Sequence, residues 1–275
     1  RENGVLLYDI MTERSEITNV LQREFALQTA VFGKLATGTP ENPAVVMESV
    51  HYFHKSVSGL ALKRPAWFFD VTQVGESLAD VGTHLFDLVQ WECFPDQALD
   101  YAQDIQVQSA RHWPTPLTAA QFETVTGLDA FPDFLKSRVQ DGVLNVFDNG
   151  EVNYRIKGSH ARVTARWDYQ APAGAGDTHY SLVRGTKCNL VIRQGAAENH
   201  KPTLYLEAAE GTDPIAFRRL LMPALLDIQQ RFPGVDVIPL ATSWQIVIPE
   251  HYNVGHEAHF AEVTGRFLKY LDAGR

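Results

Sequence analysis

Apolar and polar residues recur with two different periods along this chain, and each period predicts a kind of element. Between residues 5 and 32 apolar side chains recur every three or four positions, which predicts a helix, and a short strand is expected before it at residues 4–10. Residues 44–57 alternate instead and are rich in Val, Tyr and Phe, which predicts a strand. We therefore expect a strand and a helix within residues 1–35, then a strand and a helix within residues 44–95.

From residue 100 to residue 210 the pattern is mostly that of β-strands. The alternation predicts strands at residues 105–111, 160–169, 179–184, 187–193 and 203–208. The pair Asn149-Gly150 between two alternating segments predicts a hairpin with a type I′ turn. Residues 114–136 are interrupted by prolines and are expected to form a connection with short helical turns. The short turns between strands favour antiparallel neighbours.

The last part of the chain, residues 211–275, returns to helical spacing. A helix is expected at residues 214–232, kinked or split by Pro223, then a strand at residues 244–248. A terminal helix at residues 255–271 would place Phe260 and Phe267 on its inner side. This order of elements predicts one domain over residues 1–275 with an α+β fold, in which helices pack on one face of a large, open, predominantly antiparallel sheet.

Composition and charge narrow the classes of partner. The chain has 275 residues, a net charge of −9 and no run of Lys or Arg, which argues against nucleic acid or an anionic membrane surface. No apolar run approaches the roughly 18 residues that span a membrane. The only cysteines, Cys93 and Cys188, are too few for a disulfide framework or a Cys-rich zinc site. A cytoplasmic location is expected; the periplasm is the alternative, because the chain begins with Arg1 and an upstream segment is expected to be missing.

Residues 75–91 combine a packing face with ionisable groups. Projected on one helix, Asp80, His84, Asp87 and Trp91 fall in a stripe about 60° wide, away from a second, apolar stripe. Because ionisable groups are costly to bury unless they are paired, the stripe is either a satisfied polar network or one wall of an active site. Asp80 and His84 are four residues apart and can meet on a helix. Such a pair suits general acid–base catalysis, and a structural pair on the helix surface is the alternative.

The same spacing, Asp-x-Gly-x-His-x-x-Asp-x-x-x-Trp, resembles the signature helix in the substrate domain of the Gfo/Idh/MocA oxidoreductases. Longer blocks at residues 48–53, 64–71, 88–95 and 255–260 resemble the putative oxidoreductase C-terminal domain of Bacteroidetes-type proteins. The resemblance covers most of the chain. It implies the substrate domain of an NAD(P)-dependent oxidoreductase that transfers a hydride at a hydroxyl-bearing carbon of a sugar or sugar derivative. It also implies His84 as the acid/base and Asp80 as the group that orients it or the substrate, with Asp87 and Trp91 as structural residues.

The other half of such an enzyme is not found in this sequence. No Gly-x-Gly-x-x-Gly lies between a strand and a helix, and there is no Glu-Lys-Pro, the motif that carries the family's catalytic lysine. We therefore expect a missing N-terminal Rossmann domain, with NAD or NADP bound by the full-length protein and not by this chain alone, which would be inactive. The large sheet face predicts a homo-oligomer in the parent protein.

Five further residues are candidates for contacts with a substrate. Trp67, Trp167 and His179 are aromatic or polar residues on or beside strands, and such side chains bind sugars. Arg14 is a candidate for an anionic group of the substrate or cofactor, and His256 for the substrate cleft. For each residue, ordinary packing, a helix-terminal contact or a surface ion pair is the alternative.

Two other functions are alternatives to this assignment. One rival is an NAD-dependent glycoside hydrolase of the same superfamily, and the other is a non-catalytic carbohydrate-binding or assembly module. The sequence His256-Glu257-x-His259 lacks the spacing of a zinc-protease motif, so no metal site is expected.

Overall fold

A large sheet forms most of the molecule, in a computed structural model that describes residues 6–57 and 59–274. The strands are β1 (Val45–His54), β4 (Ile105–Thr118), β5 (Val139–Gln140), β6 (Val143–Ile156), β7 (Ser159–Gln170), β8 (Thr178–Arg184), β9 (Cys188–Arg193), β10 (Thr203–Ala208), β11 (Asp236–Pro239) and β12 (Trp244–Val247). They form one ten-stranded sheet in the order β11-β12-β10-β9-β8-β1-β7-β6-β4, and β5 pairs with β6. Two short strands, β2 (Ser56–Val57) and β3 (Leu60–Ala61), pair separately.

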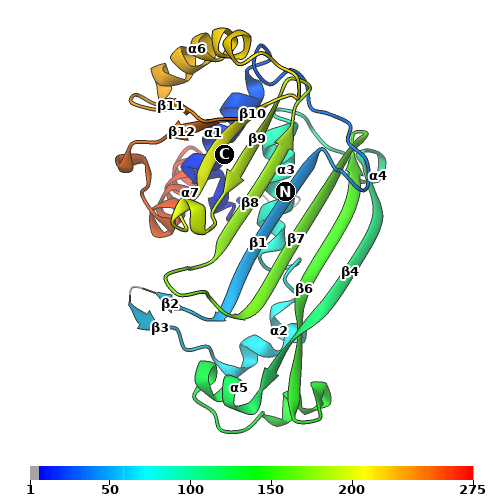
Figure 1. The fold of residues 1–275 in the computed structure, drawn as a ribbon. Coiled ribbons are helices and arrows are strands. Elements are labelled where there is room, and N and C mark those ends of the chain that lie inside the picture. The colour runs from blue at the N-terminus through cyan, green and yellow to red at the C-terminus, as the bar shows by residue number, and fades with distance from the viewer. Residues whose placement is uncertain (1–5, 58, 275) are drawn as a thin grey trace.

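The neighbouring strands of the large sheet are antiparallel, except that β1 and β7 are parallel. The helices are α1 (Ile17–Leu27), α2 (Val71–Val74), α3 (Gly82–Cys93), α4 (Tyr101–Asp104), α5 (Ala119–Thr126), α6 (Pro214–Arg231) and α7 (His256–Asp272), and the 3₁₀ turns are η1 (Thr12–Ser15), η2 (Ala66–Phe69), η3 (Asp133–Arg138), η4 (Ala196–Glu198) and η5 (Glu250–Tyr252). Figure 1 shows α1 and α3 behind the sheet. The predicted α+β class, with a predominantly antiparallel sheet and helices on one face, is confirmed. In the described part of the chain no helix has the length and apolar character that a membrane span requires.

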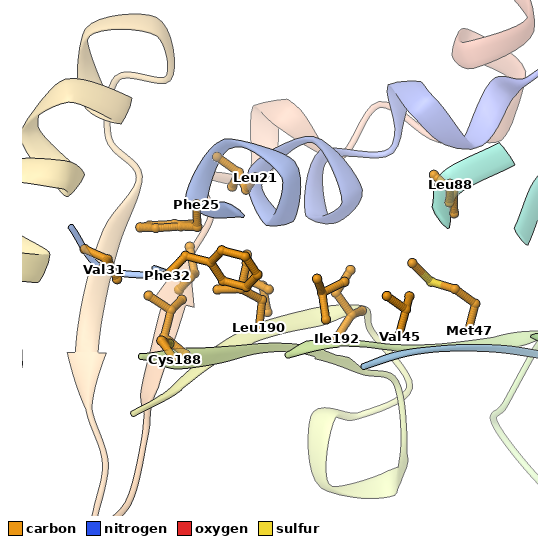
Figure 2. Close-up of a cluster of buried hydrophobic side chains, with 14 of the residues drawn as sticks. Leu21, Phe25, Val31, Phe32, Val45, Met47, Leu88, Cys188, Leu190 and Ile192 are labelled. Atoms are coloured by element: carbon orange, nitrogen blue, oxygen red, sulfur yellow. The ribbon is translucent and has the colours of Figure 1, made fainter. Parts of the chain in front are cut away.

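The main hydrophobic core lies between this sheet and the helices α1 and α3. Figure 2 shows Leu21 and Phe25 of α1 and Leu88 of α3 pointing toward the sheet, where Met47 of β1 and Leu190 of β9 point back at them. All five side chains are at most 1% exposed. Burial of one such side chain stabilises the fold by about 1.5–3 kcal/mol, so these contacts fix both helices on the sheet.

The N-terminal segment differs from its prediction. Residues 6–10 form no strand, and the rest of that expected strand, Gly4 and Val5, lies outside the described residues. The helix is shorter than expected because it begins only at Ile17, where the side chain of Glu16 accepts a hydrogen bond from the Thr18 backbone and caps it.

The hairpin predicted at Asn149-Gly150 is wrong. Strand β6 runs without a turn from Val143 to Ile156, and the turn to β7 is made by Lys157 and Gly158, with φ of 46° and 89°. Two left-handed residues are what a type I′ turn needs. Gly150 is required for another reason: a Cβ at this position would lie 2.5 Å from Cγ of Leu78, which packs on it.

The connection predicted at residues 114–136 begins later than expected, and its short helical turns are α5 and η3. Strand β4 continues through Pro114 and Pro116 to Thr118. Proline cannot donate a ladder hydrogen bond, so it is tolerated in a strand that has a neighbour on one side only, and β4 is such an edge strand.

The C-terminal part contains three further differences. Pro223 lies within α6 without splitting it, and β11 is a strand that the sequence did not predict. The helix α7 buries His259 rather than Phe260, which is 41% exposed. Helix α7 therefore packs on the molecule through a narrower contact than its apolar residues suggested.

Candidate functional site

A cavity of about 480 Å³ lies on the helix side of the sheet, where β1 and β8 meet the start of α3. The sheet contributes Ser49 and His51 from β1 and His179 from β8 to its lining. Because Val45 and Met47 of β1 point toward the helices, strand alternation places Ser49 and His51 on the same face. Two polar residues on an otherwise apolar strand face are a signal in the sequence for this site that was not among the predicted contacts.

The helical side of the cavity is formed by three separate segments. His84 comes from the first turn of α3, Glu13 from η1 and His256 from the start of α7. Nδ1 of His256 lies 3.8 Å from Oε1 of Glu13, so η1 and α7 approach each other at the cavity. Apolar side chains of α3, including Leu85 and Leu88, complete this wall.

The imidazole of His51 is held on two sides. Its Nδ1 lies 2.9 Å from Oδ2 of Asp177, and its ring stacks on Trp167 with 4.9 Å between the ring centroids. Oδ2 of Asp177 also accepts a hydrogen bond from Lys55. Burial opposes ionisation of Asp177, but the contacts with His51 and Lys55 outweigh it, so the pKa of this carboxyl lies below its ordinary value.

Five of the residues that line the cavity each have a buried polar atom with no hydrogen-bond partner within the described residues. These atoms are Ser49 Oγ, His51 Nε2, His84 Nδ1, His179 Nε2 and Asp177 Oδ1. Burial lowers the pKa of His179 to about 4, so its ring is neutral near pH 7. Buried polar groups nearly always have partners, which indicates that a polar ligand or water completes this cavity.

The motif segment at residues 75–91 is not one helix. Helix α3 begins at Gly82, and Asp80 lies in the turn before it with an exposed side chain. The helical projection that placed Asp80 in the stripe with His84 is therefore wrong, because helical spacing applies only inside the helix. No hydrogen bond joins Asp80 to His84 within the part of the chain that the structure describes, and Asp80 does not line the cavity.

The other two residues of the stripe, Asp87 and Trp91, hold α3 against η1 and α1. Asp87 accepts two hydrogen bonds from Arg14 of η1, one of 2.7 Å from Nε. Trp91 lies under the guanidinium of Arg23 of α1, 5.0 Å from the ring centroid. Arg14 is thus occupied by an ion pair and lines a separate cavity of about 350 Å³.

The remaining predicted residues fall into two groups. His179 and His256 line the cavity together with His84, as a common site requires. Trp167 is 4% exposed, and its ring stacks against that of His51. Trp67, in η2, is 52% exposed and lies outside the cavity lining. His51, Asp177, Ser49 and Glu13 also line the cavity and were not predicted as site residues.

A second polar cluster, outside the cavity lining, surrounds Asp148 of β6. This residue is 3% exposed, and its Oδ1 has no partner among the described residues. Burial raises the pKa of Asp148 to about 7, and the charge of Asp80 raises it further than the guanidinium of Arg64 lowers it. Asp148 is therefore largely protonated in the folded protein below neutral pH.

We expect the substitution Asp148→Asn to stabilise the full-length protein more at about pH 8 than at about pH 5. The folded pKa lies above the ordinary value of 3.8, so the folded state keeps a proton that the unfolded chain loses, and stability falls as pH rises between these two values. Asparagine resembles the protonated carboxyl and avoids this loss. About two pH units separate pH 5 from the folded pKa, so the gain at about pH 8 should be larger by about 2–3 kcal/mol. The urea midpoint at both pH values measures it.

The matched control for this prediction is Asp168→Asn. The Asp168 carboxylate is partly exposed and accepts a 2.8 Å hydrogen bond from Arg166, so its amide variant gains nothing at high pH. An equal effect of Asp148→Asn at both pH values would contradict the protonation of this carboxyl.

The residues present do not suit a metal or a dinucleotide. Within residues 6–57 and 59–274 no group of three or more His, Cys, Asp or Glu side chains is arranged to hold a metal ion. A dinucleotide site needs a Gly-rich turn between a strand and a helix of a parallel unit. The sheet here has one parallel pair, β1 and β7, and no such turn occurs in the sequence.

Comparison with known proteins places the chain in a family. Residues 21–275 match the family model described as "Putative oxidoreductase C terminal domain". An oxidoreductase structure from Parabacteroides merdae ATCC 43184 is 48% identical, with a TM-score of 0.96, over 100% of this chain and 63% of that protein. This chain therefore spans less than two thirds of the relative's length. No protein of curated function matches it.

Two other solved structures are more distant. Levoglucosan dehydrogenase, in complex with NADH and levoglucosan, is 13% identical with a TM-score of 0.49, over 96% of this chain and 56% of that one. An oxidoreductase from Erwinia carotovora atroseptica SCRI1043 is 15% identical with a TM-score of 0.46, over 82% of this chain and 56% of that one. The match to the family model and the likeness to the Parabacteroides structure show that this chain belongs to the oxidoreductase C-terminal domain family, as its sequence blocks indicated.

Proposed function

We propose that this chain is the substrate-holding part of a nicotinamide-dependent oxidoreductase that acts on a sugar or sugar derivative. Its family supports the class of reaction, and the cavity at the end of β1 and β8 supports the class of substrate. NAD or NADP would be bound by a Rossmann domain elsewhere in the full-length protein, because the described residues do not fit a dinucleotide. The isolated chain would then be inactive.

The observation that carries the proposal is the set of five unpartnered polar atoms around one cavity. Sugar hydroxyls both donate and accept hydrogen bonds, so they can satisfy imidazole nitrogens, a serine hydroxyl and a carboxylate at the same time. The apolar side chains of Leu85 and Leu88 would contact the C–H face of a sugar ring. A cavity of about 480 Å³ is large enough for a small ligand.

In this proposal His84 takes the proton of the reacting hydroxyl. Its Nδ1 is buried in the cavity lining without a partner among the described residues, so it can accept a hydrogen bond from a substrate O–H. When the hydroxyl is oxidised, the O–H proton moves to His84, and the nicotinamide supplies the acceptor for the hydride. Asp80 is exposed and lies outside the cavity lining, so in this proposal its carboxylate does not bind His84. It would act only through its charge, which raises the pKa of Asp148.

The test is turnover by the full-length protein. We expect NAD⁺ or NADP⁺ to be reduced in proportion to the sugar oxidised, measured by nicotinamide absorbance together with product analysis. Cleavage of a glycoside without net NADH would instead support the NAD-dependent hydrolase. Sugar binding by a full-length protein that catalyses neither reaction would support the non-catalytic module.

We also propose that the sheet face away from α1 and α3 pairs with a second copy in the full-length protein. This face carries Tyr180 and Tyr205, both partly exposed, beside a small apolar cluster of Val46, Leu182 and Val191, which are at most 8% exposed. Among the described residues no helix of the main core packs on that cluster. Sedimentation of the full-length protein as a monomer would contradict this pairing.

A further inference from the structure

The orientation of His51 in the cavity is fixed by three neighbours. The Asp177 carboxylate holds Nδ1 at 2.9 Å, and the stacked ring of Trp167 restricts rotation about the side-chain bonds. Lys55 binds the same carboxylate oxygen as Nδ1. No described side chain orients His84 by a hydrogen bond, so His51 is the better-oriented imidazole of the two.

Asp177 is itself held in place by the backbone around it. Gln194 donates hydrogen bonds of 3.2 Å and 3.1 Å to the carbonyl oxygens of Asp177 and His200. The side-chain oxygen of Gln194 accepts a 2.8 Å hydrogen bond from the His179 backbone. These three bonds fix the chain where it enters β8, and an oriented carboxylate on a fixed segment makes a preorganised site.

The charge of Asp177 decides which nitrogen of His51 carries the hydrogen. An ionised carboxylate only accepts hydrogen bonds, so Nδ1 of the neutral imidazole must be the donor. Nε2 is then a bare acceptor in the cavity lining, where it is buried and unpartnered. Oδ1 of Asp177 is a second buried, unpartnered acceptor in the same lining.

We infer that His51 and Asp177 form a pair of fixed hydrogen-bond acceptors that selects ligands presenting two hydroxyl donors. This inference rests on the proposed sugar substrate and extends it to residues that determine specificity. A ligand with a hydroxyl at each position satisfies both acceptors. A ligand in which one hydroxyl is replaced by hydrogen or fluorine leaves a buried acceptor unpaired, and sites of this kind reject such analogues strongly.

The binding test uses the full-length protein with glucose, galactose and mannose and with the deoxy and deoxyfluoro derivatives of each, measured by calorimetry. We expect at least one parent sugar to bind and two of its hydroxyls to be required, each replacement weakening binding by about 10- to 100-fold. Fluorine keeps the size of the hydroxyl and removes its donor, so a deoxyfluoro sugar that binds like its parent overturns the inference. Absence of binding by all three parents also overturns it.

Two matched variants separate the effect of the His51 side chain from a general disturbance of strand β1. His51→Phe keeps a ring on Trp167 but has no acceptor, so the ratio of affinities between the parent and one deoxyfluoro sugar should fall toward one. The control His54→Phe lies on the same strand beside Tyr169 and outside the cavity, and should keep the wild-type ratio. An unchanged ratio in His51→Phe would contradict the role of His51.

A third measurement does not depend on any ligand. ¹⁵N chemical shifts of the His51 ring at about pH 8 should report hydrogen on Nδ1, and Asp177→Asn should remove that preference because an amide can donate as well as accept. Hydrogen on Nε2 in the wild type overturns the inference. If the selectivity and the tautomer are as expected but no nicotinamide is reduced, the inference stands and the proposed oxidation fails.

Discussion

Replacing His84 by alanine in the full-length protein is expected to lower turnover of its sugar substrate by about 10²-fold or more while cofactor binding stays unchanged. A positioned acid or base contributes about 10²- to 10⁴-fold, and His84 is the residue for which both the motif and the cavity support this role. The variant removes the imidazole without touching the ion pair of Asp87 that holds α3 on η1. Steady-state kinetics and titration of NADH fluorescence measure the two effects.

The control for this substitution is His251→Ala. His251 is exposed in η5 and lies outside the cavity lining, so the same loss of an imidazole should leave turnover at the wild-type level. Wild-type turnover in the His84 variant would refute its proposed role. Loss of NADH binding in that variant would show instead that the change disturbs the fold.

The second large effect is structural. We expect Gly150→Val to lower the stability of the full-length protein by about 1–3 kcal/mol, because its Cβ would lie 2.5 Å from Cγ of Leu78. Valine is favoured over glycine in strands by intrinsic preference, so a loss of stability identifies the contact as the cause. Leu78 belongs to the turn that leads into α3, and its displacement should also reduce turnover. The urea midpoint followed by tryptophan fluorescence measures the stability.

Two variants isolate the contact between Gly150 and Leu78. Gly176→Ala is the neutral control, since nothing lies within 4 Å of a Cβ at that position. The double variant Gly150→Val, Leu78→Ala removes the clash, so the two substitutions together should cost less than the sum of their separate effects. Strict additivity would mean that Leu78 is not what excludes a side chain from Gly150.

The sequence predicted elements well where the period was regular and the neighbours mattered little. Strand β10 was predicted with its observed bounds, Thr203–Ala208, and β1, β8, β9 and α6 within a few residues. Alternation and helical spacing follow from backbone geometry, which each short segment carries by itself. The Asn-Gly pair misled for the same reason: its turn preference is local, whereas the pairing of β6 with β4 and β7 along its whole length is not.

The same distinction between local pattern and tertiary contacts applies to the candidate site. The sequence by itself determined the family, the α+β class and the presence of His84 on a helix. It could not determine that helix α3 begins after Asp80, because polar residues can follow helical spacing both before and after the residue at which a helix begins.

Only the tertiary structure decided what surrounds His84. His51 and Asp177 are 126 residues apart in the chain and meet because β1 and β8 are adjacent in the sheet. The order of strands depends on packing over the whole sheet. The alternation of apolar and polar residues within β1 or β8 does not indicate which strands are its neighbours. The sequence therefore indicated His84, His179 and His256 separately, and only the fold brought them to one cavity beside His51 and Asp177.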